Sequence, residues 1–270
     1  MPLTRRIGLA AIGLAMLACS DSPSGPTTPT IPDAATLLAE MSSSIIGAAE
    51  SFAGSSNVNV VLPTSASDPQ ACTYNAGTGF FTCPTVTTGS LTISLMYRFI
   101  DAAGNSQSKP DAQTSAFETK TTVSGTLTST TTNPRPSTSS YTINSASDQT
   151  LSELRAENHT LNGITTTTIQ GTLQSSGTTL PLDEHLKETT SNLVLPNARK
   201  GQKWPLSGTI TVEDTSNDFD PFAPTVTYLT TITFHGTSKV TFTFSGPFGS
   251  SSCTVDLAAA PGTGFGGCTP

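Results

Sequence analysis

The strongest constraint on the fold of this chain is an alternation of side chains between residues 203 and 244. Apolar Ile210 and Val212 alternate there with Thr209 and Thr211. Two further stretches of the same segment repeat the pattern, with Val, Tyr, Ile and Phe on one side and mainly Thr on the other. Apolar side chains at every second position, with β-branched Thr between them, are typical of strands that bury one face. The segment therefore predicts three strands of an antiparallel meander.

The same alternation runs through most of the chain after residue 57 and predicts an all-β fold. Residues 151–161 and 164–173 are predicted as two strands, because the Asn162-Gly163 step between them is a common hairpin turn. Residues 179–195 predict a further strand, in which residues 183–188 could instead form a helical turn. Glycine recurs inside predicted strands, as at Gly208, and an inward-facing glycine permits a sheet to coil or another element to approach closely. Unrelated glycines at bulges or strand ends are the alternative. We therefore expect one large curved antiparallel meander sheet or partial barrel.

One amphipathic helix is predicted before the strands, at residues 33–54. Asp33 is a good N-cap residue and Gly54 a good C-cap residue. The apolar side chains between them fall on one stripe at spacings of three and four: Ala34, Leu38, Met41, Ile45, Ala48 and Phe52. Such a stripe needs a partner, and we expect the helix to pack on the sheet. A helix–helix contact in a dimer is the alternative.

The first residues are typical of an export signal. Arg5 and Arg6 precede an apolar run at residues 7–18, which is shorter than the roughly 20 residues that a membrane-spanning helix needs but suits a signal peptide. The run ends in Ala-Met-Leu-Ala-Cys, which resembles the lipobox of bacterial lipoproteins. That resemblance implies a lipidated Cys19 as the first mature residue, anchored to a membrane and facing the periplasm or the cell exterior. The alternative is an ordinary secretory leader with an incidental cysteine.

The domain organisation follows from these signals. Residues 1–18 are predicted to be a signal peptide, and residues 19–32 to be the lipidated cysteine with a tether rich in Pro, Ser and Thr. Such a composition cannot bury a core and favours an extended segment. Residues 33–270 are predicted to form a single β-rich domain.

The four other cysteines support export. They form two local pairs, Cys72 with Cys83 and Cys253 with Cys268, and each pair brackets a segment that contains glycines. Local pairing is the favoured one of the three connectivities that four cysteines allow. Disulfides of this kind persist in oxidising compartments outside the cytoplasm. The spacing does not match that of a zinc site.

One acidic segment is a candidate cation site. Glu213, Asp214, Asp218 and Asp220 lie within eight residues of a predicted hairpin loop, and Ca²⁺ prefers oxygen ligands of this type. The segment lacks the glycine and terminal glutamate of an EF-hand, so a solvated acidic loop is the alternative. No other cofactor is indicated, and no serine, histidine or carboxylate pattern identifies a catalytic residue.

The charge of the chain narrows the range of possible partners and functions. The net charge is −7 and only 11% of residues are charged, which disfavours nucleic acid as a partner because phosphate binding requires a basic surface. The sequence best fits a membrane-anchored lipoprotein with a structural or interaction role in the cell envelope. A non-catalytic module that holds an apolar or lipid-like ligand between helix and sheet is the alternative, and a hydrolase is a weaker one. The sequence indicates neither a particular protein partner nor a particular ligand.

Overall fold

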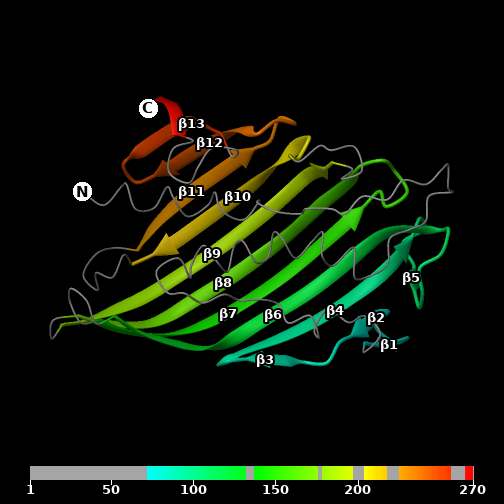
Figure 1. The fold of residues 1–270 in the computed structure, drawn as a ribbon, viewed down its shortest axis with the longest axis horizontal. Helices are drawn as coiled ribbons and strands as arrows, with labels where there is room; N and C mark the ends of the chain where they lie inside the picture. Colours follow the sequence, from blue (N-terminus) through cyan, green and yellow to red (C-terminus); the bar gives the residue numbers. More distant parts are fainter. Residues whose placement is uncertain are drawn as a thin grey trace.

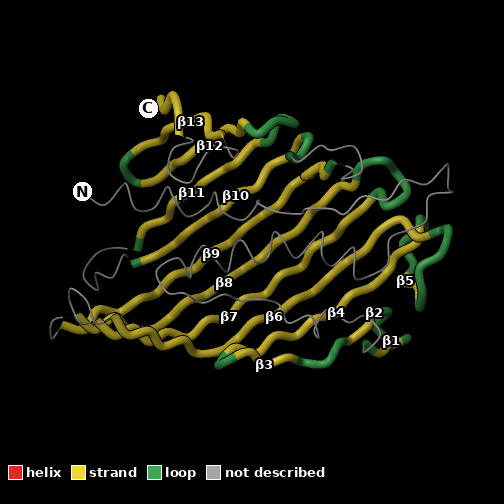
Figure 2. Tube along the Cα trace, in the orientation of Figure 1, coloured by secondary structure: helices red, strands yellow, loops and turns green. Residues whose placement is uncertain are grey.

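The computed structural model describes six stretches of the chain: residues 72–131, 137–175, 178–196, 204–217, 225–256 and 265–269. The predicted signal peptide, tether and helix all precede residue 72 and lie outside the described residues. Figure 2 shows that the described part consists of strands joined by loops and turns, and no helix is assigned within it.

The described residues form one antiparallel sheet of 14 strands (Figure 1). The strands are β1 (Thr73–Asn75), β2 (Phe80–Thr82), β3 (Val86–Thr88), β4 (Leu91–Asp101), β5 (Ser106–Gln107), β6 (Thr114–Thr131), β7 (Ser137–Ser152), β8 (His159–Ser175), β9 (Thr178–Leu195), β10 (Ser207–Ser216), β11 (Val226–Thr233), β12 (Lys239–Gly246), β13 (Gly249–Asp256) and β14 (Phe265–Thr269). From β6 to β14 each strand pairs with the next one in the chain, while β3 and β5 pair only with β4. The predicted all-β antiparallel meander is confirmed. The sheet is open, because β1 and β14 end the strand order and do not pair with each other.

Four long strands form the middle of the sheet. Strands β6 to β9 contain 16 to 18 residues each, against 3 to 10 in most globular proteins. They pair along almost their whole length, as Figure 1 shows. Thr and Ser occupy most outward positions, where β-branched residues favour extended backbone. The prediction of a strand at residues 179–195 is confirmed by β9, and the alternative of a helical turn at residues 183–188 is wrong, since these residues lie inside that strand.

The predicted hairpin at Asn162-Gly163 is also wrong. Strand β8 runs through both residues, and the chain reverses before it, next to Glu153 in the left-handed conformation. The register between β8 and β9 shifts between Leu161 and Gly163, and the Asn162 side chain accepts a hydrogen bond of 2.8 Å from the backbone of Asn192. An Asn-Gly pair usually forms a tight turn. In this strand the pair lies at a β-bulge instead.

The two faces of the sheet differ in composition. We call the face with Tyr97, Phe117 and Leu151 the inner face, and the face with Arg98 and Glu118 the outer face. Side chains such as Thr92, Thr126 and Glu213 leave much of the outer face exposed to solvent. The apolar core lies on the inner face: Tyr97, Phe99, Phe117, Leu151, Leu161, Leu193, Ile210, Ile232, Phe234, Val240, Phe242 and Val255.

The core is densely filled at the end of the strands where the aromatic side chains gather. Phe81 stacks on Tyr97 with ring centres 4.8 Å apart, and Phe99 and Phe117 lie 5.2 Å apart. Phe117 and Leu151 are both 0% exposed. Burial of each such side chain contributes roughly 1.5–3 kcal/mol to folding, so this end makes a large apolar contribution to stability.

Gly208 lies at a β-bulge and at a close approach between two strands, which is the alternative to a role of glycine in coiling the sheet; the coiling role stays a prediction. Its φ of 105° lies in the region that favours glycine, and a Cβ there would overlap the backbone oxygen of Asn192 on β9. The register between β9 and β10 shifts next to it, between Ser207 and Thr209. Glycine thus permits both the bulge and the close approach of the neighbouring strand.

Candidate functional site

The predicted cysteine pair nearest the described N-terminal edge is confirmed. Cys72 and Cys83 form a disulfide across 11 positions of sequence. Cys83 is buried, and both residues pack against the apolar core. The disulfide therefore ties the start of the described chain to the edge of the sheet. The predicted lipidation site, Cys19, lies outside the described residues.

For the second predicted pair, Cys253 with Cys268, the structure shows the state of Cys253 and the backbone on either side of the predicted bond. Cys253 is disulfide-bonded, and it lies on β13, which pairs with β14, the strand that contains Cys268. The register of these strands shifts at Cys253, between Ser252 and Thr254. The backbone thus places Cys253 beside the part of β14 around Cys268. The pairing of these two residues stays a prediction.

The acidic segment is arranged differently from the predicted loop. Glu213 and Asp214 lie within β10, which continues to Ser216, so they point to opposite faces of the sheet. Glu213 is exposed opposite Lys187, whereas Asp214 faces inward. Asp218 and Asp220 lie outside the described residues. Among the residues that are described, no three His, Cys, Asp or Glu side chains come together to hold a metal ion. A calcium site at this segment stays a prediction.

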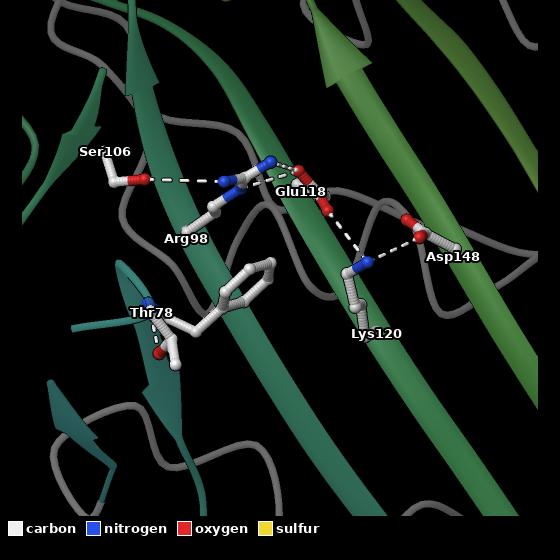
Figure 3. A network of polar contacts seen from close by, with 7 residues as sticks. Thr78, Arg98, Ser106, Glu118, Lys120 and Asp148 are labelled. Atoms are coloured by element: carbon white, nitrogen blue, oxygen red, sulfur yellow. Dashed lines mark hydrogen bonds and ion pairs between the residues drawn. The ribbon is translucent and has the colours of Figure 1, made fainter. Parts of the chain in front are cut away.

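A charged network on the outer face was not identified from the sequence (Figure 3). Arg98 of β4 and Glu118 of β6 are cross-strand neighbours, joined by a hydrogen bond of 2.7 Å from Arg98 Nε to Glu118 Oε2. Lys120 lies 3.5 Å from Glu118 Oε1 and 2.7 Å from Asp148 Oδ2 on β7. The hydrogen bond with Asp148 raises the pKa of Lys120. Opposite charges directly across neighbouring strands are the sheet equivalent of helical ion pairs.

The two cations of this network lie over an aromatic ring. The guanidinium carbon of Arg98 lies 4.7 Å from the ring centre of Phe80 on β2, and Lys120 Nζ lies 5.5 Å from it. Glu118 is only 6% exposed, and its carboxylate contacts two cations. The two positive and two negative charges balance, and the contacts hold the β2 edge on β4, β6 and β7. We therefore assign the network a structural role at this edge of the sheet.

A second polar group lies in the middle of the inner face. Ser147 on β7, Thr165 on β8 and Glu188 on β9 form one cross-strand row. The hydroxyl groups of Ser147 and Thr165 lie 2.9 Å apart and hydrogen-bond to each other. In the next row, Gln149 on β7 pairs with Gly163 on β8. These side chains share the inner face with the apolar core but lie beyond its aromatic end.

Two members of this group have unmet hydrogen-bonding capacity. Burial raises the pKa of Glu188 to about 7, and within the described part of the chain the structure gives this carboxyl no hydrogen bond or ion pair. Gln149 is only 2% exposed, and its side-chain Oε1 atom has no hydrogen-bond partner among the described residues. Unsatisfied buried acceptors are uncommon in folded proteins and require an explanation. This inner-face polar group is the candidate functional site.

The sequence contains a signal for this site. Glu188 has the same parity in its strand as Leu182 and Leu186, which predicts that it faces inward with them. The alternative of a helical turn at residues 183–188, kept open beside the predicted strand, concealed that parity.

Comparison with known proteins does not identify this chain. No protein-family model matches it, and no curated protein or solved structure is similar enough to count as a match. Among the residues that the structure describes, none forms a helix with the length and apolarity needed to cross a membrane. Function is therefore argued from the sequence and from the geometry of the sheet.

Proposed function

We propose that this chain is an exported lipoprotein, anchored to a membrane of the cell envelope through Cys19, with a structural or interaction role. The observation that carries the proposal is the Cys72–Cys83 disulfide, because structural disulfides persist in oxidising compartments. The resemblance of the first 19 residues to a lipoprotein leader supplies the route to that compartment. Both observations favour a location facing the periplasm or the cell exterior.

The proposal includes the predicted helix at residues 33–54 as a cover for the inner face. The described strands form a single layer (Figure 1), yet apolar inner-face side chains along them are buried: Ile93 is 2% exposed and Ile169 4%. An open single layer leaves the middle of both faces to solvent unless something covers one of them. The apolar stripe around Ile45 matches this requirement.

The cover can be tested by two matched truncations. Ile45→Ala removes buried methyl groups if the helix is docked, and we expect it to lower the free energy of unfolding by about 2–5 kcal/mol. Ser43→Ala, on the polar side of the same helix, should change it by no more than about 0.5 kcal/mol. Urea melts of the two variants would decide, and equal stabilities would contradict the docked helix.

A structural or interaction role is favoured over a carrier of apolar ligands. The aromatic end of the inner face is filled by the protein's own side chains, with Phe117 and Leu151 at 0% exposure and Leu161 at 1%. The middle of the same face carries polar side chains, among them Thr165 and Glu188. Burying polar groups against a lipid chain without hydrogen bonds is costly. The inner face therefore offers poor chemistry for a lipid-like ligand.

The anchor is tested by Cys19→Ser, with Ser20→Ala as the matched control. We expect the Cys19→Ser chain to accumulate as unprocessed precursor and to lose labelling by a fatty-acid probe, while Ser20→Ala is processed and labelled normally. Several acyl chains hold a protein to a membrane far more firmly than the marginal binding of one, so the mature protein should stay with membranes after a salt wash. Persistent labelling of Cys19→Ser would exclude the lipid anchor.

A further inference from the structure

The four long strands project beyond their neighbours at one end of the sheet (Figure 1). The described pairing of β4 with β6 ends at Gly125, and that of β10 with β9 ends at Glu184. Beyond these points, residues 126–131 of β6 and residues 178–183 of β9 are the two edges of a four-stranded projection. Each edge pairs with a described strand on one side only. The backbone N–H and C=O groups on the other side of such an edge can receive another strand.

The edge formed by β9 is protected against such an addition. Pro181 lies in this edge, and proline has no N–H group to offer a partner strand. Asn217, which follows β10, donates its backbone N–H to the carbonyl oxygen of Asp183 at 3.2 Å, and its Oδ1 atom accepts the backbone N–H of Asp183 at 3.3 Å. The exposed Asp183 carboxylate adds a charge. Proline, charge and cover by a loop are common protections of a strand edge.

The edge formed by β6 has none of these protections. Residues 126–131 read Thr-Leu-Thr-Ser-Thr-Thr, without a charged residue or a proline. Their register against β7 is regular, without a bulge, and Thr126, Thr128 and Thr130 are exposed. Among the described strands, none pairs with this segment on the side away from β7. An uncharged segment of high β-propensity readily pairs with another strand, so the contrast with β9 points to a partner at β6.

The turn between β3 and β4 marks where the open edge begins. A Cβ added at Gly125 would overlap the backbone oxygen of Ser90 in that turn. The turn therefore lies directly against β6, and the edge is open from Thr126 onward. On the paired side, the hydroxyl oxygens of Thr126 and Thr142 lie 3.4 Å apart. Cross-strand threonine pairs stabilise antiparallel sheets, so the open side best suits a strand that offers threonines in return.

We propose that the β6 edge pairs with the same edge of a second copy of this chain. An antiparallel pairing about a two-fold axis at Thr128 places Thr128 opposite itself and Thr126 opposite Thr130. Positions that differ by an even number lie on one face of a strand, so the outer face continues from one copy to the other. Symmetric contacts in which a patch binds its own copy are the commonest in oligomers. This inference goes beyond the lipoprotein proposal and does not depend on the anchor.

Cysteine cross-linking tests the pairing in the purified full chain in dodecyl maltoside. Opposite residues of antiparallel strands have Cα atoms about 4.5–5.5 Å apart, within the roughly 4.4–6.8 Å of a disulfide. Thr128→Cys should therefore give a disulfide-linked dimer under mild oxidation. Ser140→Cys is the matched control, because Ser140 pairs with Thr128 on β7 and would lie three strand spacings, about 14 Å, from its copy. Cys19 is present in both variants and cannot account for a difference between them.

The outcomes of the cross-linking separate the possible occupants of the edge. A dimer with Thr128→Cys and none with Ser140→Cys supports the proposal. Absence of the Thr128→Cys dimer, or equal cross-linking of both variants, would overturn it. Cross-linking of Thr128→Cys to a different protein in isolated membranes, without a dimer of the purified chain, would assign the edge to a foreign strand and would also overturn the proposal.

A charge exchange tests the two-fold register. Thr128→Lys and Thr128→Glu each place like charges opposite one another, which is unfavourable across a strand pair, and each should weaken self-association at least tenfold in sedimentation velocity. An equimolar mixture of the two variants should recover it, because Lys then faces Glu, and this recovery also shows that both variants are folded. Ser140→Lys, one strand away from the edge, should associate like the parent chain. Unchanged association of both Thr128 variants, or no recovery in the mixture, would overturn the register.

Discussion

Replacing Glu188 by glutamine should change the stability of the protein in a pH-dependent way. In the unfolded chain this carboxyl loses its proton near its ordinary pKa of 4.5, but burial in the folded protein raises the pKa to about 7. Between about pH 4.5 and pH 7, the folded state therefore holds a proton on this carboxyl that the unfolded state has already released. Stability from this group is fully present below pH 4.5, declines as the pH rises to 7, and stays at its lower value above pH 7.

The size of the effect follows from the shift. Each pKa unit corresponds to 1.36 kcal/mol, so the rise in pKa of about 2.5 sets an upper bound of about 3.4 kcal/mol. Glu188 is half-buried, and solvent screening reduces the figure to about 2 kcal/mol. Glutamine has nearly the same shape and no charge, so Glu188→Gln should avoid this cost. We expect it to match the parent protein at pH 4 and to be about 2 kcal/mol more stable at pH 8.

The assay is a urea titration at pH 4, 6 and 8, followed by the fluorescence of the single tryptophan, Trp204. Glu213→Gln on the exposed outer face is the control, since it alters the net charge equally without affecting the inner face. The difference between Glu188→Gln and this control should grow from pH 4 to pH 8. A difference that is constant with pH, or a loss of stability at pH 8, would refute the argument from burial.

Three further substitutions and one control substitution test the packing, each by urea melts. Gly208→Ala should cost at least about 1–3 kcal/mol, because alanine is strained at a φ of 105°, and a neutral effect would contradict the bulge geometry. Leu151→Ala should cost about 2–5 kcal/mol, whereas Leu229→Ala at a 39% exposed position should change stability by about 0.5 kcal/mol or less; equal effects would contradict the assignment of faces. Arg98→Met should cost about 3 kcal/mol because it leaves the buried carboxylate of Glu118 with one cation fewer, and an effect below about 0.5 kcal/mol would mean that the network is not stabilising.

The main features of the sheet could be predicted because alternation is a local signal. The alternation around Ile210 and Val212 specifies which face is buried, and the structure places Ile210 in the core and Thr209 and Thr211 on the outer face. The Cys72–Cys83 disulfide was predictable for the same reason, since its partners are close in sequence.

Features that depend on neighbouring strands were harder to predict. Asn162-Gly163 has the composition of a turn, but its role is set by Gln149 on β7 and by a register shift against β9. The ion pair of Arg98 with Glu118 joins residues 20 positions apart, and only the register of two strands brings them together. Likewise, the acidic segment appears continuous in sequence, but the extension of β10 to Ser216 separates Glu213 from Asp214.

The inner-face polar group combines a feature that local sequence predicts with one that depends on neighbouring strands. The inward direction of Glu188 follows from local parity with Leu186. Its position two strands and one row away from Gln149 does not, because that position follows from the pairing of β7 with β8 and of β8 with β9.

Mass spectrometry of the protein isolated from membranes tests the central claim, that this is an exported, lipid-anchored chain, most directly. Cleavage after Glu40 should release an N-terminal peptide of residues 19–40 that carries the mass of the attached acyl chains. The same sample, alkylated without reduction, should contain Cys72 and Cys83 joined to each other and not alkylated. An N-terminal peptide that retains Arg5 and Arg6 without lipid, together with alkylated Cys72 and Cys83, would contradict the account.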